Sequence, residues 1–91
     1  MEDTNHNSDS HELQPGLYQH YKGAIYVVYF VGYHTETHEK LIVYRSYAPP
    51  HTIWIRPYRM FISKVELPDG TMVPRFRKLT REEEDRFISQ E

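Results

Sequence analysis

The stretch AIYVVYFVGYH, residues 24–34, decides the fold class of this 91-residue chain. Most of its residues are β-branched or aromatic, which favours an extended strand. Alternation places Ile25, Val27, Tyr29, Val31 and Tyr33 on one face and Tyr26, Val28 and Phe30 on the other. Because both faces are apolar, the pattern predicts a strand at the centre of a small barrel. Gly32 interrupts the run, and an interior glycine is typical of a bulge or a sharp bend.

Short apolar segments separated by turn residues surround this strand. Residues 17–21, 41–47 and 53–57 predict further strands, and the polar segment 35–40 joins 24–34 to residues 41–47 as a hairpin. A second hairpin is expected over residues 64–76, with Asp69-Gly70 as its turn, and one irregular or 3₁₀ turn over residues 58–62. Five or six short strands in about 60 residues predict a mainly β fold, a small SH3-like antiparallel barrel.

The two ends differ from this middle part. Residues 1–14 have one leucine and no periodicity, so we expect a disordered acidic arm. Residues 15–78 form the β domain. Residues 79–91 predict a short C-terminal helix and tail, because Thr80 and Glu83 have the spacing of a capping box.

Charge is unevenly distributed along the chain, although the net charge is only −2. Residues 1–15 carry four acidic side chains and no Lys or Arg, residues 16–78 carry nine basic and four acidic, and residues 79–91 carry two basic and five acidic. A basic domain suits an anionic partner, and the acidic ends would then compete with that partner for the basic surface. Alternatively, the acidic ends only aid solubility.

Composition excludes several classes of protein. The chain has no cysteine, so it has neither disulfides nor thiolate metal sites. No apolar run approaches the roughly 20 residues of a membrane span, and the acidic start is unlike a signal peptide. We therefore expect a cytoplasmic protein that does not bind a membrane. Nucleotide-binding loops and nucleophile motifs are also lacking.

Five segments, taken in order, resemble one family. They are GLYQHYKGAIYVV (16–28), HTETHE (34–39), IVYRSY (42–47), IWIRPYRMF (53–61) and DGTMVPRF (69–76). The chain is similar over residues 16–76 to the uncharacterised bacterial domain of unknown function 1653 family. Thr35 stands where that family usually has Ser, and His38 occupies a position that its pattern leaves free. The resemblance implies a small SH3-like β domain and no assigned activity.

The segment HTETHE is open to three interpretations. His34, Glu36 and His38 would share one side of an extended strand and could hold a zinc ion, or Glu36 and Glu39 could act as an acid–base pair. A polar hairpin turn is the third interpretation and the one that the surrounding strands favour. In such a turn, Glu36 or Glu39 would accept a bidentate bond from Arg45, Arg56 or Arg75 of neighbouring strands.

Trp54 and Arg56 alternate with Ile53 and Ile55 on one predicted strand. If the isoleucines fill the core, Trp54 and Arg56 line an outer surface that suits a base or a peptide ring together with an anion. Alternatively, Trp54 closes one end of the barrel. Farther along, the segment VPRFRK places basic residues around Phe76, which is typical of nucleic-acid-binding strands and equally of a core residue beside solvated cations.

The sequence therefore favours an uncharacterised, non-enzymatic binding module without catalytic residues, cofactor or metal. The candidate ligand-binding residues are Trp54, Arg56, Arg45, Arg75, Tyr44, His34 and Glu36. One hypothesis for the partner is single-stranded RNA or DNA, or a nucleotide. Another is a protein or peptide, bound in an aromatic groove or added to a sheet edge. A third hypothesis is metal-assisted hydrolysis centred on His34 and Glu36.

Overall fold

The computed structural model describes residues 12–89. Its elements in chain order are β1 (Gly16–His20), β2 (Ile25–Tyr33), β3 (Lys40–Ser46), β4 (Ile53–Pro57), α2 (Tyr58–Phe61), β5 (Lys64–Glu66), β6 (Met72–Pro74), β7 (Phe76–Lys78) and α3 (Arg81–Ser89). The predicted N-terminal arm lies outside the described residues up to position 11.

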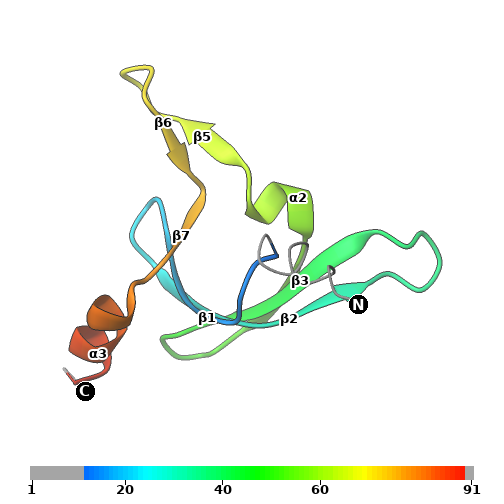
Figure 1. Ribbon diagram of the computed structural model, residues 1–91, viewed down its shortest axis with the longest axis horizontal. Helices are drawn as coiled ribbons and strands as arrows, with labels where there is room; N and C mark the ends of the chain where they lie inside the picture. Colours follow the sequence, from blue (N-terminus) through cyan, green and yellow to red (C-terminus); the bar gives the residue numbers. More distant parts are fainter. Residues whose placement is uncertain (1–11, 90–91) are drawn as a thin grey trace, which may run out of the picture.

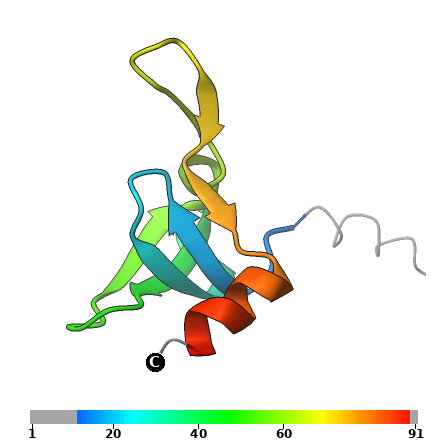
Figure 2. The ribbon, with the colours of Figure 1, turned by 90° about the vertical axis from the view of Figure 1, so that its left-hand side faces the viewer.

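Five strands form one antiparallel sheet in the order β4-β3-β2-β1-β7, and β5 pairs with β6 as a separate hairpin. Figure 1 and Figure 2 show this hairpin projecting away from the larger sheet. The prediction of a mainly β fold with a central strand at 24–34 is confirmed. The prediction of a closed barrel is wrong, because β4 and β7 are the two edges of the sheet and do not pair with each other.

The core lies on one face of the sheet, beneath α2. Its buried residues are Tyr18, Val28, Ile42, Tyr44, Phe61 and Phe76. The Phe61 ring, carried by α2, stacks on Phe76 with ring centroids 3.9 Å apart and planes at 3°. Leu13 packs against the same cluster, and its N–H donates to the Tyr58 hydroxyl at 3.0 Å. Large rings therefore fill much of a core built from short strands.

β2 contains a bulge at Tyr29. Val28 pairs with Tyr44 and Phe30 pairs with Val43, so that Tyr29 has no partner of its own on β3. Because the extra residue breaks the alternation, Phe30 is 65% exposed and Val31 packs against the core. The predicted faces of residues 30 and 31 are therefore wrong. Gly32, where the bulge was expected, pairs regularly with Leu41.

The predicted Asp69-Gly70 turn and the capping box at Thr80 are confirmed, whereas the irregular or 3₁₀ turn predicted over residues 58–62 is the short α-helix α2. At the tip of β5–β6, Gly70 has φ +90° and the Asp69 carboxylate accepts the Thr71 N–H at 2.9 Å. At the start of α3, Glu83 N–H donates to the Thr80 hydroxyl at 3.1 Å and Thr80 N–H donates to the Glu83 carboxylate at 2.8 Å, which is a capping box.

α3 lies beside β1 and β7, at one end of the sheet (Figures 1 and 2). Leu17 and Leu79 are buried there, and Leu79 N–H donates to the Leu17 carbonyl at 2.9 Å. Farther along α3, the Phe87 ring contacts Tyr47 with centroids 4.7 Å apart.

Within residues 12–89, neither helix has the length and apolar character that a bilayer crossing requires.

Candidate ligand-binding face

The register of β3 and β4 decides which residues share a face. Tyr44 pairs with Trp54 and Ile42 with Arg56, so Trp54 and Arg56 lie on the face that carries the core. Ile53 and Ile55 lie on the opposite face and are 62% and 65% exposed. The expectation that the two isoleucines fill the core is therefore wrong. Both alternating sets of this strand contain large apolar side chains, so its sequence does not reveal which set faces inward.

Arg56 is held over the rings of the core. Its Nε donates to the Tyr44 hydroxyl at 3.1 Å, and its guanidinium carbon lies 5.7 Å from the centre of the Phe76 ring. Arg56 belongs to one edge strand and Phe76 to the other, so the sheet is curved enough for side chains of its two edges to meet. The guanidinium is partly buried, and its planar donors remain suited to a carboxylate or phosphate.

His20 continues the same surface on β1. Its ring lies 5.0 Å from Phe76 and 6.5 Å from Tyr26, and its Nδ1 accepts the Lys22 N–H at 3.1 Å. Burial, followed by the positive charge of Arg56, lowers the pKa of His20 below its usual range. Lys22 and Arg75 add to this effect. The three cations Arg56, Lys22 and Arg75 thus create a positive potential around the His20 ring.

We call this surface the arginine–aromatic face and define it as His20, Tyr26, Tyr44, Trp54, Arg56 and Phe76. Arg75 lies beside it, where its Nε donates to the Ser63 hydroxyl at 3.0 Å. Trp54 is 48% exposed at the edge of the face. A half-exposed indole beside a guanidinium offers both a stacking surface and an anion contact.

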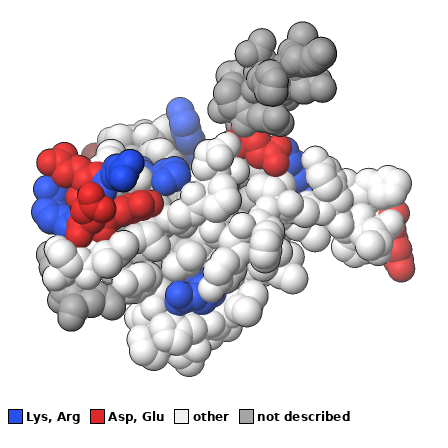
Figure 3. Space-filling view, turned by 60° about the horizontal axis from the view of Figure 1, so that its bottom comes forward, with Lys and Arg blue, Asp and Glu red and all other residues white. Residues whose placement is uncertain are grey.

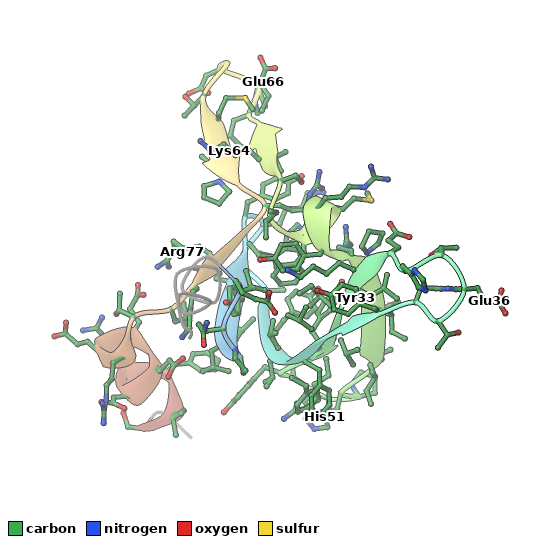
Figure 4. All side chains as sticks on the ribbon, turned by 45° about the vertical axis from the view of Figure 1, so that its right-hand side comes forward. Tyr33, Glu36, His51, Lys64, Glu66 and Arg77 are labelled. Carbon is green, nitrogen blue, oxygen red and sulfur yellow. The ribbon has the colours of Figure 1, made fainter. Side chains whose placement is uncertain are left out.

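No carboxylate pairs with Arg56 or Arg75 in the part of the chain that the structure describes. The ion pairs between described residues are Lys40–Glu12 at 2.8 Å, Arg77–Glu83 at 2.9 Å and Lys78–Glu84 at 3.4 Å. Among residues 12–89, acidic side chains from both ends thus pair with cations other than Arg56 and Arg75. Arg77 of β7 is labelled in Figure 4, beside α3.

Arg45 is separated from the other candidate residues. It pairs with Ile53 in the register and lies on the opposite face of the sheet from Arg56. Its Nε donates to the Tyr29 hydroxyl at 2.5 Å, and its Nη1 lies 2.9 Å from His51 Nδ1. In Figure 4, His51 is seen below the sheet. The predicted grouping of Arg45 with Trp54 and Arg56 is therefore wrong. Successive residues of a strand point to opposite faces of the sheet, so Arg45 and Ile53 lie on the other face from Tyr44 and Trp54.

His34 and Glu36 lie in the turn between β2 and β3, and Figure 4 shows Glu36 pointing outward. The turn interpretation is confirmed: His38 N–H donates to the His34 carbonyl at 2.9 Å, and His34 Nδ1 accepts N–H groups of Glu36 and Thr37 at 3.1 and 3.2 Å. The prediction that Glu36 or Glu39 binds a neighbouring arginine is wrong among residues 12–89. Those residues also contain no cluster of three or more His, Asp or Glu side chains arranged to hold a metal ion.

Of the predicted residues, the structure thus brings together Tyr44, Trp54 and Arg56, with Arg75 beside them. The sequence did not single out His20 or Tyr26 as candidate residues, although both belong to this face. The available signal for His20 was its place within the family motif. That motif does not indicate which face of the sheet the His20 side chain occupies.

Comparison with known proteins agrees with the resemblance seen in the sequence. The family described as "Protein of unknown function (DUF1653)" matches residues 16–78. The structure is similar to the crystal structure of a protein belonging to DUF1653 from Bordetella bronchiseptica. That similarity has a TM-score of 0.66 and 31% sequence identity, and covers 75% of this chain and 88% of the other. No curated protein matches the chain. The chain therefore belongs to the DUF1653 family.

Proposed function

We propose that the domain is a binding module for anions that carry a ring, either single-stranded nucleic acid or a nucleotide, and that the arginine–aromatic face is its binding surface. The observation that carries the proposal is the position of Arg56. Its guanidinium is fixed by the Tyr44 hydroxyl over Phe76, next to the half-exposed Trp54, with no carboxylate partner among residues 12–89.

The chemistry of this face matches such a ligand in two respects. Trp54 offers a flat ring on which a base can stack, and base–aromatic stacking contributes about 1–3 kcal/mol per base. Arg56 and Arg75 offer donors for phosphate, and Arg56 is ordered by its hydrogen bond before any ligand arrives. Little side-chain entropy is then lost on binding.

Trp54 is the only tryptophan of the chain, so its fluorescence reports directly on this face. We would titrate the protein with a mononucleotide and, separately, with short single-stranded RNA of mixed sequence, each at two salt concentrations. The expected result is a change of Trp54 fluorescence whose apparent affinity falls with salt. For a single strand, the log–log slope is about −0.7 for each phosphate contact. A change of Trp54 fluorescence with RNA and not with the mononucleotide identifies the ligand as a polymer.

Two arginine variants decide which face binds. Arg56→Gln removes one cation from the arginine–aromatic face and should weaken RNA binding while reducing the salt slope by about 0.7, the value for one phosphate contact of a single strand. Arg45→Gln makes the same change of charge on the opposite face and should leave both quantities as in the wild type. If Arg45→Gln weakens binding and Arg56→Gln does not, the proposed surface is wrong. An unchanged Trp54 signal with both ligands at low salt, together with unshifted amide resonances, contradicts the proposal itself.

A further inference from the structure

The edge strand β4 exposes backbone groups that nothing in residues 12–89 satisfies through strand pairing. Immediately before β4, Ser46 N–H donates to the Thr52 carbonyl at 3.0 Å. Hydrogen-bonded pairs alternate along an antiparallel ladder. Trp54 and Arg56 therefore direct their N–H and C=O groups toward β3, while Ile53 and Ile55 direct theirs outward.

The same two isoleucines extend an apolar surface on the outer face of the sheet. Phe30 of β2 pairs with Val43 of β3, and Val43 pairs with Ile55 of β4, so that these three side chains form one row across the strands. Phe30 and Ile55 are both 65% exposed. Figure 3 shows a face whose centre is mostly uncharged, with a basic patch toward its lower side, charged side chains at its upper edge, a charged cluster at the left end and an acidic tip at the right end.

The other edge of the sheet is protected from pairing. β7 has three residues, and its Arg77 and Lys78 are engaged by Glu83 and Glu84 of α3. Charged side chains and short length are common means of preventing association at a sheet edge. β4 has five residues, and Arg56 is its only charged residue. Within the described residues, the five-stranded sheet therefore has one open edge, β4, and one closed edge, β7.

We propose that two copies of this chain pair through β4, antiparallel and about a two-fold axis at Ile55. Such pairing places Ile55 opposite Ile55 of the second copy, so that each donates one backbone hydrogen bond and accepts one. The row Phe30–Val43–Ile55 then continues into the same row of the second copy.

The chemistry of β4 is complementary to itself in this register. Arg56 of each copy lies opposite Trp54 of the other, which offers a cation–π contact. Because only residue 55 is opposite itself, Arg56 never faces another Arg56, and β4 has no acidic residue to repel or attract a partner. Ile53 lies opposite Pro57, which lacks an N–H, so the ladder ends there. With β7 closed, the joined five-stranded sheets have no further open edge, and association through these sheets stops at two copies.

The mass of the protein across a concentration series tests the proposal by light scattering and sedimentation. The wild type should form a reversible dimer. Ile55→Lys places a charge opposite itself at the axis and should be monomeric throughout. Ile88→Lys makes the same substitution at a site on α3 that is 53% exposed, and should dimerise like the wild type. A wild type that remains monomeric, or an Ile55→Lys variant that dimerises as well as Ile88→Lys, overturns the proposal.

Cysteine trapping tests the register, because the chain has no cysteine of its own. In a hydrogen-bonded antiparallel pair the Cα atoms are about 5.5 Å apart, which a disulfide can span. The Ile55→Cys variant should therefore cross-link rapidly to a second copy under mild oxidation. Ile53→Cys, opposite Pro57, and Ile88→Cys should cross-link slowly. Equal rates for the three variants would contradict pairing at Ile55. The substituted positions lie off the arginine–aromatic face, but the proposed pair brings Trp54 and Arg56 of that face together across the axis, so both experiments are done without nucleotide or nucleic acid present.

Discussion

Phe61 is fully buried where α2 meets the sheet, and its ring stacks on Phe76. Phe61→Ala leaves a cavity beneath α2 that the short helix cannot fill, and we expect it to lower the free energy of unfolding by about 3–5 kcal/mol. Phe30→Ala removes the same ring from an exposed position and should change stability by about 0.5 kcal/mol or less. Urea unfolding of both variants at low protein concentration measures the difference. Similar losses in the two variants would place the core elsewhere.

His20 should make stability depend on pH. Burial and the charge of Arg56 lower its pKa in the folded state below the ordinary value of 6.5. The unfolded chain then binds the proton more readily, so the contribution of His20 is fully present above pH 6.5 and is lost as the pH falls toward the folded-state pKa. Urea unfolding above and below this range should show the loss in the wild type and not in His20→Gln. A His20 ring that titrates above 6.5 by NMR would contradict the expectation.

For single residues, the sequence predicts which side chains act together better than it predicts which face of the sheet each side chain occupies. Tyr44, Trp54 and Arg56 were expected to act together, and the register places all three on one face. The same register exposes Ile53 and Ile55, which were expected to fill the core. A strand with large apolar side chains at both alternating sets has no preferred inner side by itself, and the partner strand decides.

The helix α3 depends on its capping box. Thr80 is the N-terminal cap, and Arg77, together with the Thr80 N–H, lowers the pKa of Glu83 to about 2. Thr80→Ala should lower stability by about 1 kcal/mol, because one helix N–H loses its acceptor. Thr35→Ala, in the exposed hairpin turn, is the control and should have little effect. Amide exchange within α3 should accelerate only in the Thr80 variant, and unchanged exchange would mean that packing of Phe87 alone holds the helix.

Among the elements, the strands and turns with local signals were predicted well, and the bulge was not. Asp69-Gly70 marks its turn and Thr80 marks its helix start, because both features act through side chains within a few residues. The bulge at Tyr29 arises from how β2 and β3 match each other in length and curvature. Tyrosine has no special tendency to bulge, so the sequence pointed to Gly32 instead.

Residues 12–14 tie the N-terminal side of the chain to the folded domain. Leu13 packs on the core, the Gln14 carbonyl accepts the Tyr18 hydroxyl at 2.7 Å, and Glu12 pairs with Lys40. We expect a chain that begins after residue 14 to be less stable than one that begins after residue 11, by about 1–2 kcal/mol for the lost burial of Leu13. Thermal unfolding of the two truncated proteins provides the measurement. Equal melting temperatures would show that the three residues add nothing.

The closed barrel that the sequence predicted is the largest difference for the molecule as a whole. Five or six short strands were predicted, and residues 12–89 form seven, five of them in one sheet. Closure of that sheet requires that its first and last strands exchange hydrogen bonds. Here Arg56 and Phe76 bring side chains of the two edges together without backbone pairing. Whether the two edge strands pair depends on the curvature summed over all five strands. No single segment of the sequence determines that curvature.

The extra residue in β2 also affects how relatives of this chain should be aligned. A homologous strand that lacks the residue at position 29 would keep Val28, Phe30 and Val31 on their present sides, because Tyr29 is the residue without a partner. An alignment with such a homologue that contains no gap would match each core-facing residue of the strand after position 29 with a surface-facing residue, and the reverse. Conservation measured across that boundary would then mix the pattern of the core with that of the surface, and a one-residue gap opposite Tyr29 would restore both.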